Sequence, residues 1–225
     1  MKTSNKGLVE LAGHEGICLS KYKDSVGVWT VGIGATRSEI PSIASWPLSR
    51  TITMQEAFEL LSRSIVKYED AVNAALTRSV SQHQFDALVS WCYNVGVGYT
   101  QGSRTATVIK LLNQGATPDQ LHRALMMYRK PKEIIGRRTK EANLLAYGKY
   151  SNDGKALLFP VSSKGYPIYS RGTSINVWEH IEKTSGVEPT PEEIPKEEEK
   201  ALETKPSWLQ RTLILLDEYL KKGKA

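Results

Sequence analysis

Cysteine and histidine are scarce in this sequence of 225 residues. The two cysteines, Cys18 and Cys92, are too few and too far apart for a disulfide framework or a CxxC metal or redox site, so we expect two buried thiols. The four histidines show no metal-ligand spacing such as HExxH. We therefore predict no metal and no cofactor.

Long apolar runs are missing as well. A membrane-spanning helix needs about 18 or more apolar residues in a row, and no segment approaches that length. Residues 1–16 lack the apolar core of a secretory signal. With 40% hydrophobic and 24% charged residues, the composition is that of a globular protein. We expect the chain to stay in the cytoplasm where it is made until another agent moves it.

Positive charge exceeds negative charge, but unevenly. The net charge is +6; residues 1–150 hold 19 basic and 12 acidic side chains, whereas residues 184–205 hold 3 and 7. A basic globular part suits an anionic polymer, such as nucleic acid or a bacterial envelope, although charge that serves only solubility explains the excess equally well. No nucleic-acid-binding motif is present, so we predict no nucleic-acid partner.

Helix-start signals recur through the first 150 residues. Three capping boxes pair Thr53 with Glu56, Ser81 with Gln84, and Thr117 with Gln120. The sequence predicts helices over Ser4–His14 and residues 54–76, 82–94, 105–114, 118–128 and 137–147, with stops at Gly96 and Gly148.

The segment CLSKYKDSVGVWTVGIGAT, residues 18–36, has a residue pattern that differs from that of the predicted helices. β-Branched and aromatic residues alternate with Gly and polar residues, which predicts a small antiparallel sheet with a turn at residues 24–27. Residues 1–150 are therefore expected to form a mostly helical α+β domain with a small β lobe and a cleft that suits a polymer.

Three further segments follow residue 150. We expect residues 151–183 to form a hairpin or an extended strap, with Pro160 and Pro167 outside any central strand. Residues 184–205 are rich in Pro and Glu and read as an extended or disordered linker. Apolar residues at helical spacing predict an amphipathic helix over residues 206–225. This helix either folds back on the first domain or docks on a partner protein, a second copy or a membrane surface.

Two carboxylates stand in contrasting environments near the N-terminus. Glu15 continues the core-facing stripe of Leu8, Leu11 and Ala12, so its carboxyl resists ionisation and can keep a proton, as a general acid needs. Asp24, in a turn rich in backbone donors, stays ionised. Such a pair can cleave a glycosidic bond, and the Thr30 hydroxyl could hold a water. The alternative is that these residues only cap a helix and build a strand.

The spacing of these three residues resembles a known family. Glu15, Asp24 and Thr30, followed by Gly32 and Gly34, are similar to the catalytic signature of the bacteriophage lysozymes (endolysins) of glycoside hydrolase family 24. The segments QFDALVSWCYNVG (84–96) and GRRTKEANLLAYG (136–148) also resemble that family. The resemblance covers residues 1–150 and implies a lysozyme-like fold.

The same resemblance implies roles. Glu15 would be the general acid, Asp24 the residue that positions or activates water, and Thr30 its assistant, in an inverting hydrolysis of peptidoglycan between N-acetylmuramic acid and N-acetylglucosamine. The implied sugar contacts are Tyr93, Asn94 and Thr107, and Arg137 would support the site or pair with an internal acid.

Two features depart from the family pattern. Ala35 stands where histidine is frequent, and residues 37–50 fit poorly around Trp46, where they would reshape one lip of the cleft. No N-terminal signal-anchor segment is apparent, so release from the cytoplasm is expected to need a membrane pore or carriage in a virion.

Three functions compete. The first is a muramidase that lyses bacteria for a phage. The second is a lytic transglycosylase, which cleaves the same bond without water; Asp24 and Thr30 argue for hydrolysis. The third is an inert lysozyme-fold binding protein of the virion, whose terminal helix is the functional part.

Overall fold

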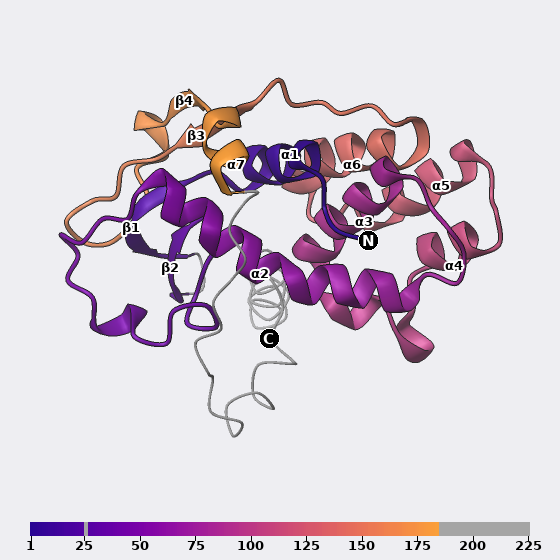
Figure 1. Ribbon diagram of the computed structural model, residues 1–225, viewed down its shortest axis with the longest axis horizontal. Helices are drawn as coiled ribbons and strands as arrows, with labels where there is room; N and C mark the ends of the chain where they lie inside the picture. The colour runs from indigo at the N-terminus through magenta and orange to yellow at the C-terminus, as the bar shows by residue number, and fades with distance from the viewer. Residues whose placement is uncertain (25–26, 185–225) are drawn as a thin grey trace, which may run out of the picture. The chain divides into compact units, whose positions relative to one another are not determined.

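The computed structural model describes residues 1–24 and 27–184. Helices occupy the segments that the capping signals predict: α1 (Asn5–Glu15), α2 (Met54–Ala75), α3 (Gln82–Val95), α4 (Thr107–Asn113), α5 (Pro118–Leu125) and α6 (Ile135–Tyr147) (Figure 1). Short 3-10 turns lie at η1 (Ile43–Ser45), η2 (Val97–Tyr99), η3 (Gly102–Arg104), η4 (Met126–Tyr128), η5 (Lys132–Ile134) and η6 (Tyr169–Arg171). The predicted helix 118–128 thus ends as an α-helix at Leu125, and its last turn tightens into η4.

The three capping boxes form as predicted. The Thr53 N–H donates to Glu56 Oε2 at 2.6 Å, and the Glu56 N–H donates to Thr53 Oγ1 at 3.1 Å. Ser81 with Gln84 and Thr117 with Gln120 repeat this reciprocal pair. Each box satisfies backbone donors that the first helical turn leaves without intrahelical partners. At the other ends, Gly96 and Gly148 end their helices with φ of 89° and 67°.

The described chain divides into two units. Unit 1 contains Met1–Gly7 and Lys67–Ser151, and unit 2 contains Leu8–Val66 and the described residues from Asn152 onward. A boundary therefore falls near residue 150, where the residue pattern of the sequence changes from helical to extended. Residues beyond it, however, join the unit that holds residues 8–66.

Unit 1 is built around α3. Every residue from Phe85 to Val95 on this helix is buried, and α6 packs against it. The Asp86 carboxylate, 1% exposed, accepts from the Ser4 N–H at 3.0 Å and from the Tyr150 hydroxyl at 2.7 Å. This one buried carboxylate therefore links the N-terminal segment and the segment after α6 to α3.

Unit 2 contains the predicted β lobe. Strands β1 (Cys18–Lys23) and β2 (Trp29–Gly32) pair antiparallel, with Tyr22 opposite Thr30. A core beneath them joins the sheet to the segment 37–50 and to the start of α2: Val31, Ala35, Ile43, Ile52, Ala57 and Leu60. Trp46 packs against this core, and the Arg50 guanidinium lies 3.6 Å from the centre of its ring. Ala35 is part of that core, at 1% exposure.

The segment after residue 151 forms a hairpin, one of the two forms expected for it. Strands β3 (Lys155–Leu158) and β4 (Thr173–Asn176) pair antiparallel, and both prolines lie outside these strands. The hairpin, orange in Figure 1, lies beside the end of α1, because both the N–H and the carbonyl of Ile17 form hydrogen bonds with it. A further helix, α7 (Trp178–Thr184), was not predicted.

The linker and the amphipathic helix predicted for residues 184–205 and 206–225 lie outside the described residues, apart from Thr184. Within the described ranges, none of the helices combines the length and the apolar character that crossing a bilayer requires. Both predicted thiols are buried: burial raises the pKa of Cys18 and of Cys92 to about 12.

Gly154 supplies a test of how the hairpin is held. Its φ is +95°, and a Cβ there would lie 2.2 Å from Trp178 Cδ1. We expect Gly154→Ala to lower the free energy of unfolding by about 2–4 kcal/mol, because backbone strain and overpacking add. The measurement is urea denaturation followed by circular dichroism.

Gly102→Ala is the matched control, since Gly102 has a φ of +62° with nothing within 4 Å of the added Cβ. The decrease in its free energy of unfolding should reflect the backbone strain alone. Equal losses in the two variants would contradict tight packing of Trp178 on the hairpin.

Candidate active site

Glu15 is the last residue of α1 and is half-buried. Leu11 and Ala12, at 1% and 0% exposure, confirm that this face of the helix points into the core. The helix stops at Gly16, whose φ is +72° and whose added Cβ would lie 2.7 Å from the Phe159 ring. Glu15 is therefore fixed by a helix on one side and by a close approach of the hairpin on the other.

Asp24 begins a closed turn. Its N–H donates to the Val28 carbonyl at 3.0 Å, and its Oδ1 accepts from the Val28 N–H at 2.8 Å. The Gly27 N–H donates to the Asp24 carbonyl at 3.0 Å, and Gly27 has a φ of +81°. These backbone bonds fix the orientation of the Asp24 carboxylate.

Thr30 lies on β2, two residues beyond Val28. It is 4% exposed, and its hydroxyl donates to the Val28 carbonyl at 3.2 Å. The peptide group of Val28 thus links Asp24 and Thr30. The hydroxyl oxygen keeps lone pairs that can accept from a water.

Tyr22 lies on β1, between the two carboxylates in the sequence, and sequence reasoning missed it. Burial raises the pKa of its phenol well above the usual range, and the charges of Cys18, Glu15, Tyr169 and Asp24 raise that pKa further. The phenol therefore stays protonated at neutral pH. Its position near the end of β1, two residues before Asp24, was the available signal.

The family resemblance implied four further residues as sugar contacts or supports of the site. The two carboxylates and Thr30 lie in unit 2, whereas all four of these further residues lie in unit 1: Tyr93, Asn94, Thr107 and Arg137. Tyr93 is 6% exposed, and its ring centre lies 4.8 Å from that of Tyr68. Asn94 is 3% exposed, and its Oδ1 accepts from Arg138 Nη2 at 2.6 Å. Thr107, the first residue of α4, is exposed and so is accessible to a ligand.

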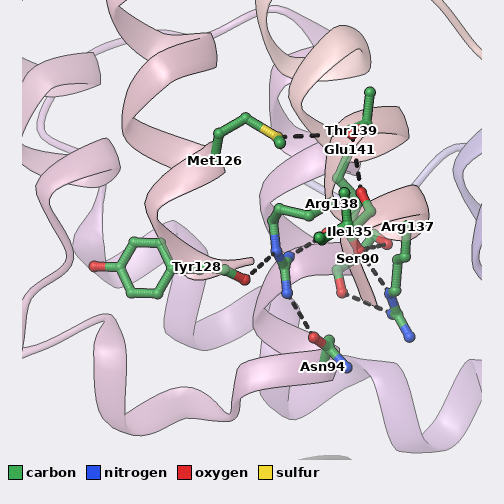
Figure 2. A network of polar contacts seen from close by, with 9 residues as sticks. All are labelled: Ser90, Asn94, Met126, Tyr128, Ile135, Arg137, Arg138, Thr139 and Glu141. Carbon is green, nitrogen blue, oxygen red and sulfur yellow. Dashed lines mark hydrogen bonds and ion pairs between the residues drawn. The ribbon is translucent and has the colours of Figure 1, made fainter. Parts of the chain in front are cut away.

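Arg137 forms an internal ion pair, which is the second of its two predicted roles. Its Nε donates to Glu141 Oε1 at 2.9 Å, and its Nη2 donates to the Ser90 carbonyl at 3.2 Å. Arg138 donates to the other oxygen of Glu141 and, through Nε, to the Tyr128 carbonyl at 2.9 Å. Figure 2 shows these groups converging between α3 and α6.

This network holds buried charge. Arg138 is fully buried and Glu141 is 1% exposed. Burial lowers the pKa of the Arg138 guanidinium, and the Glu141 carboxylate opposes that shift. In the sequence, the spacing of four and three residues from Arg137 and Arg138 to Glu141 indicates such an ion pair on one helix.

Within the described ranges, no group of three or more His, Cys, Asp or Glu side chains could hold a metal ion.

Known proteins resemble this chain over the same region. Residues 12–141 match the Phage lysozyme family. The endolysin of Salmonella phage P22 is 32% identical over 149 residues, which cover 64% of this chain and 97% of that protein. The SAR-endolysin of Enterobacteria phage P21 is 33% identical over 141 residues, covering 61% and 80%. Among solved structures, the endolysin of Escherichia coli O157:H7 phage FAHEc1 superposes with a TM-score of 0.58 at 27% identity, covering 68% and 98%.

The chain belongs to the phage lysozyme family. The expected lysozyme-like α+β fold is thereby confirmed. The enzyme is a glycoside hydrolase that acts on peptidoglycan. The match ends at residue 141, so the hairpin lies outside it.

The buried network gives a prediction about stability. We expect Glu141→Ala to cost about 3–5 kcal/mol in the free energy of unfolding, because it leaves two arginines without their shared carboxylate. Chemical denaturation measures the loss. Asp153→Ala, which breaks the exposed pair with Lys155, serves as the control and should change little. A loss at Glu141 no larger than that of the control would contradict the network's role.

Proposed function

We propose that the enzyme is a muramidase that hydrolyses the β-1,4 bond between N-acetylmuramic acid and N-acetylglucosamine with inversion at the anomeric carbon. The observation that carries the proposal is the closed Asp24–Val28 turn, which holds one carboxylate beside β2 while Glu15 stands at the end of α1. The backbone bonds of the segment after residue 151 to Ile17, near Glu15, and to Lys23, next to Asp24, support the assignment of both acids to one site.

Glu15 is the general acid in this mechanism. It donates its proton to the glycosidic oxygen as the bond to the anomeric carbon breaks, so the leaving sugar departs as a neutral alcohol. It stands half-buried at the end of the apolar face that Leu11 and Ala12 form.

Asp24 is the general base. Its ionised carboxylate takes a proton from a water that attacks the anomeric carbon on the opposite face of the sugar. The Thr30 hydroxyl accepts a hydrogen bond from that water while it donates to the Val28 carbonyl. The peptide group of Val28 thereby sets the distance between base and assistant.

Residues of unit 1 take supporting parts. We propose Thr107, which is exposed, as a direct sugar contact. Tyr93 and Asn94 are nearly covered by protein, so sugar contact by them requires side-chain movement. Arg137 supports unit 1 itself through its bonds to Glu141 and the Ser90 carbonyl.

The biological setting follows from the family. Endolysins act on the host cell wall after release, and the enzyme would lyse a bacterium for a phage. We propose that it reaches the wall from the host cytoplasm through a separate membrane pore, or is carried in the virion. Residues 206–225 would dock on the first domain, on a second copy or on a protein partner.

Replacement of the acid tests this function. Glu15→Gln should lower the rate of turbidity loss on purified Gram-negative peptidoglycan by about 10²–10⁴-fold, because the amide cannot donate the proton. Circular dichroism would confirm folding. Glu179→Gln, which changes an exposed acid on α7, is the matched control and should keep full activity.

Analysis of the products separates the reactions. Reducing muramic ends from the unchanged enzyme indicate hydrolysis, whereas anhydro ends would show a transglycosylase. A folded Glu15→Gln variant that retains full activity would remove Glu15 from the mechanism.

A further inference from the structure

The hairpin after residue 151 is bonded to both segments that carry the acids. The Ile17 N–H donates to the Leu157 carbonyl at 2.8 Å, and the Phe159 N–H donates to the Ile17 carbonyl at 2.8 Å. The Lys23 N–H donates to the Gly165 carbonyl at 2.7 Å. Ile17 lies two residues from Glu15, and Lys23 precedes Asp24. The hairpin is therefore part of the wall around the proposed site.

Phe159 packs too closely to its neighbours to shift. Added Cβ atoms at Gly16 and Gly172 would lie 2.7 and 2.5 Å from its ring. The Tyr169 ring packs edge-on against it, with centres 5.2 Å apart and planes at 72°. The position of Tyr169 is set further by the bond from the Ile168 N–H to the Pro160 carbonyl at 2.8 Å.

Tyr169 nevertheless faces solvent. It is 70% exposed, the largest value among the exposed apolar and aromatic side chains of the described residues. Leu157 and Tyr166 of the same segment are exposed as well. Exposed apolar side chains that gather on one element indicate a binding surface.

The ring also packs on a residue that is bonded next to the end of α1. Phe159, which contacts the Tyr169 ring, donates its N–H to the Ile17 carbonyl, two residues beyond Glu15. Partial burial raises the pKa of the Tyr169 phenol, and charges at Cys18 and Asp24 raise that pKa further. Tyr169 is therefore attached to the segment that carries Glu15, while most of its side chain remains exposed.

We propose that Tyr169 is a substrate-binding residue, supplied from beyond the region that matches the family, whose ring stacks on a sugar of the glycan strand next to the scissile bond. A pyranose ring presents an apolar face of C–H groups, and the flat face of a tyrosine matches it. The inference rests on the proposed function, because it places the sugar beside Asp24.

Binding of an inactive variant tests the proposal without relying on activity. In a Glu15→Gln background, Tyr169→Ala should weaken co-sedimentation with purified peptidoglycan by roughly tenfold, as for loss of an anchoring aromatic. Tyr169→Phe should bind as well as the parent, because stacking needs the ring and not the hydroxyl. Tyr147→Ala, at another exposed tyrosine, is the matched control and should bind normally.

In active enzyme, Tyr169→Ala should raise KM for peptidoglycan by roughly tenfold and change kcat by less than about threefold. If the alanine variant unfolds, Tyr169→Leu replaces it: leucine keeps an apolar contact with Phe159 but offers no flat ring, so it should show the same loss of affinity.

Unchanged binding by Tyr169→Ala or Tyr169→Leu would overturn the proposal and leave the muramidase assignment intact. Equal weakening by Tyr169→Phe would also overturn it, because the hydroxyl would then carry the contact. Failure of the muramidase assignment has a separate signature, full wall cleavage by Glu15→Gln.

Discussion

The peptide groups on either side of Ile17 constrain the site more than any other interaction in unit 2. Bonds to Leu157 and Phe159 fix the chain where α1 ends, so the direction of Glu15 depends on a hairpin about 140 residues further along the sequence. Gly16 permits this approach, since a side chain there would collide with Phe159. A short sheet of two strands is only marginally stable alone, and the hairpin adds backbone partners to it.

The two units hold their polar side chains through different kinds of hydrogen bond. Unit 1 buries an ion network in which Glu141 joins two arginines and Ser90, and removal of one member leaves the others desolvated. Unit 2 orients Asp24 with backbone bonds to Gly27 and Val28. The network of unit 1 instead bonds the Glu141 carboxylate to side-chain donors.

The sequence predicts the local structure well because the signals are local. Capping boxes, glycine stops and the alternation around Asp24 each act over a few residues, and the helices and the strand pair predicted within residues 1–150 are present. Long-range pairing was not predictable in the same way. Nothing in residues 151–178 indicates that they bond to Ile17 and Lys23, so the sequence could not place Tyr169 beside the segment that carries Glu15. The burial of Asn94 depends likewise on Arg138, an arginine 44 residues away.

The assignment of Glu15 as acid and Asp24 as base of an attacking water is tested most directly by the anomeric form of the freshly released sugar end. Proton NMR during cleavage of a soluble glycan strand, recorded before the anomers equilibrate, distinguishes the two forms. The mechanism predicts that the α-anomer appears first, because water attacks opposite the leaving β-bond. Initial release of the β-anomer would show retention through a covalent intermediate and would contradict the role assigned to Asp24.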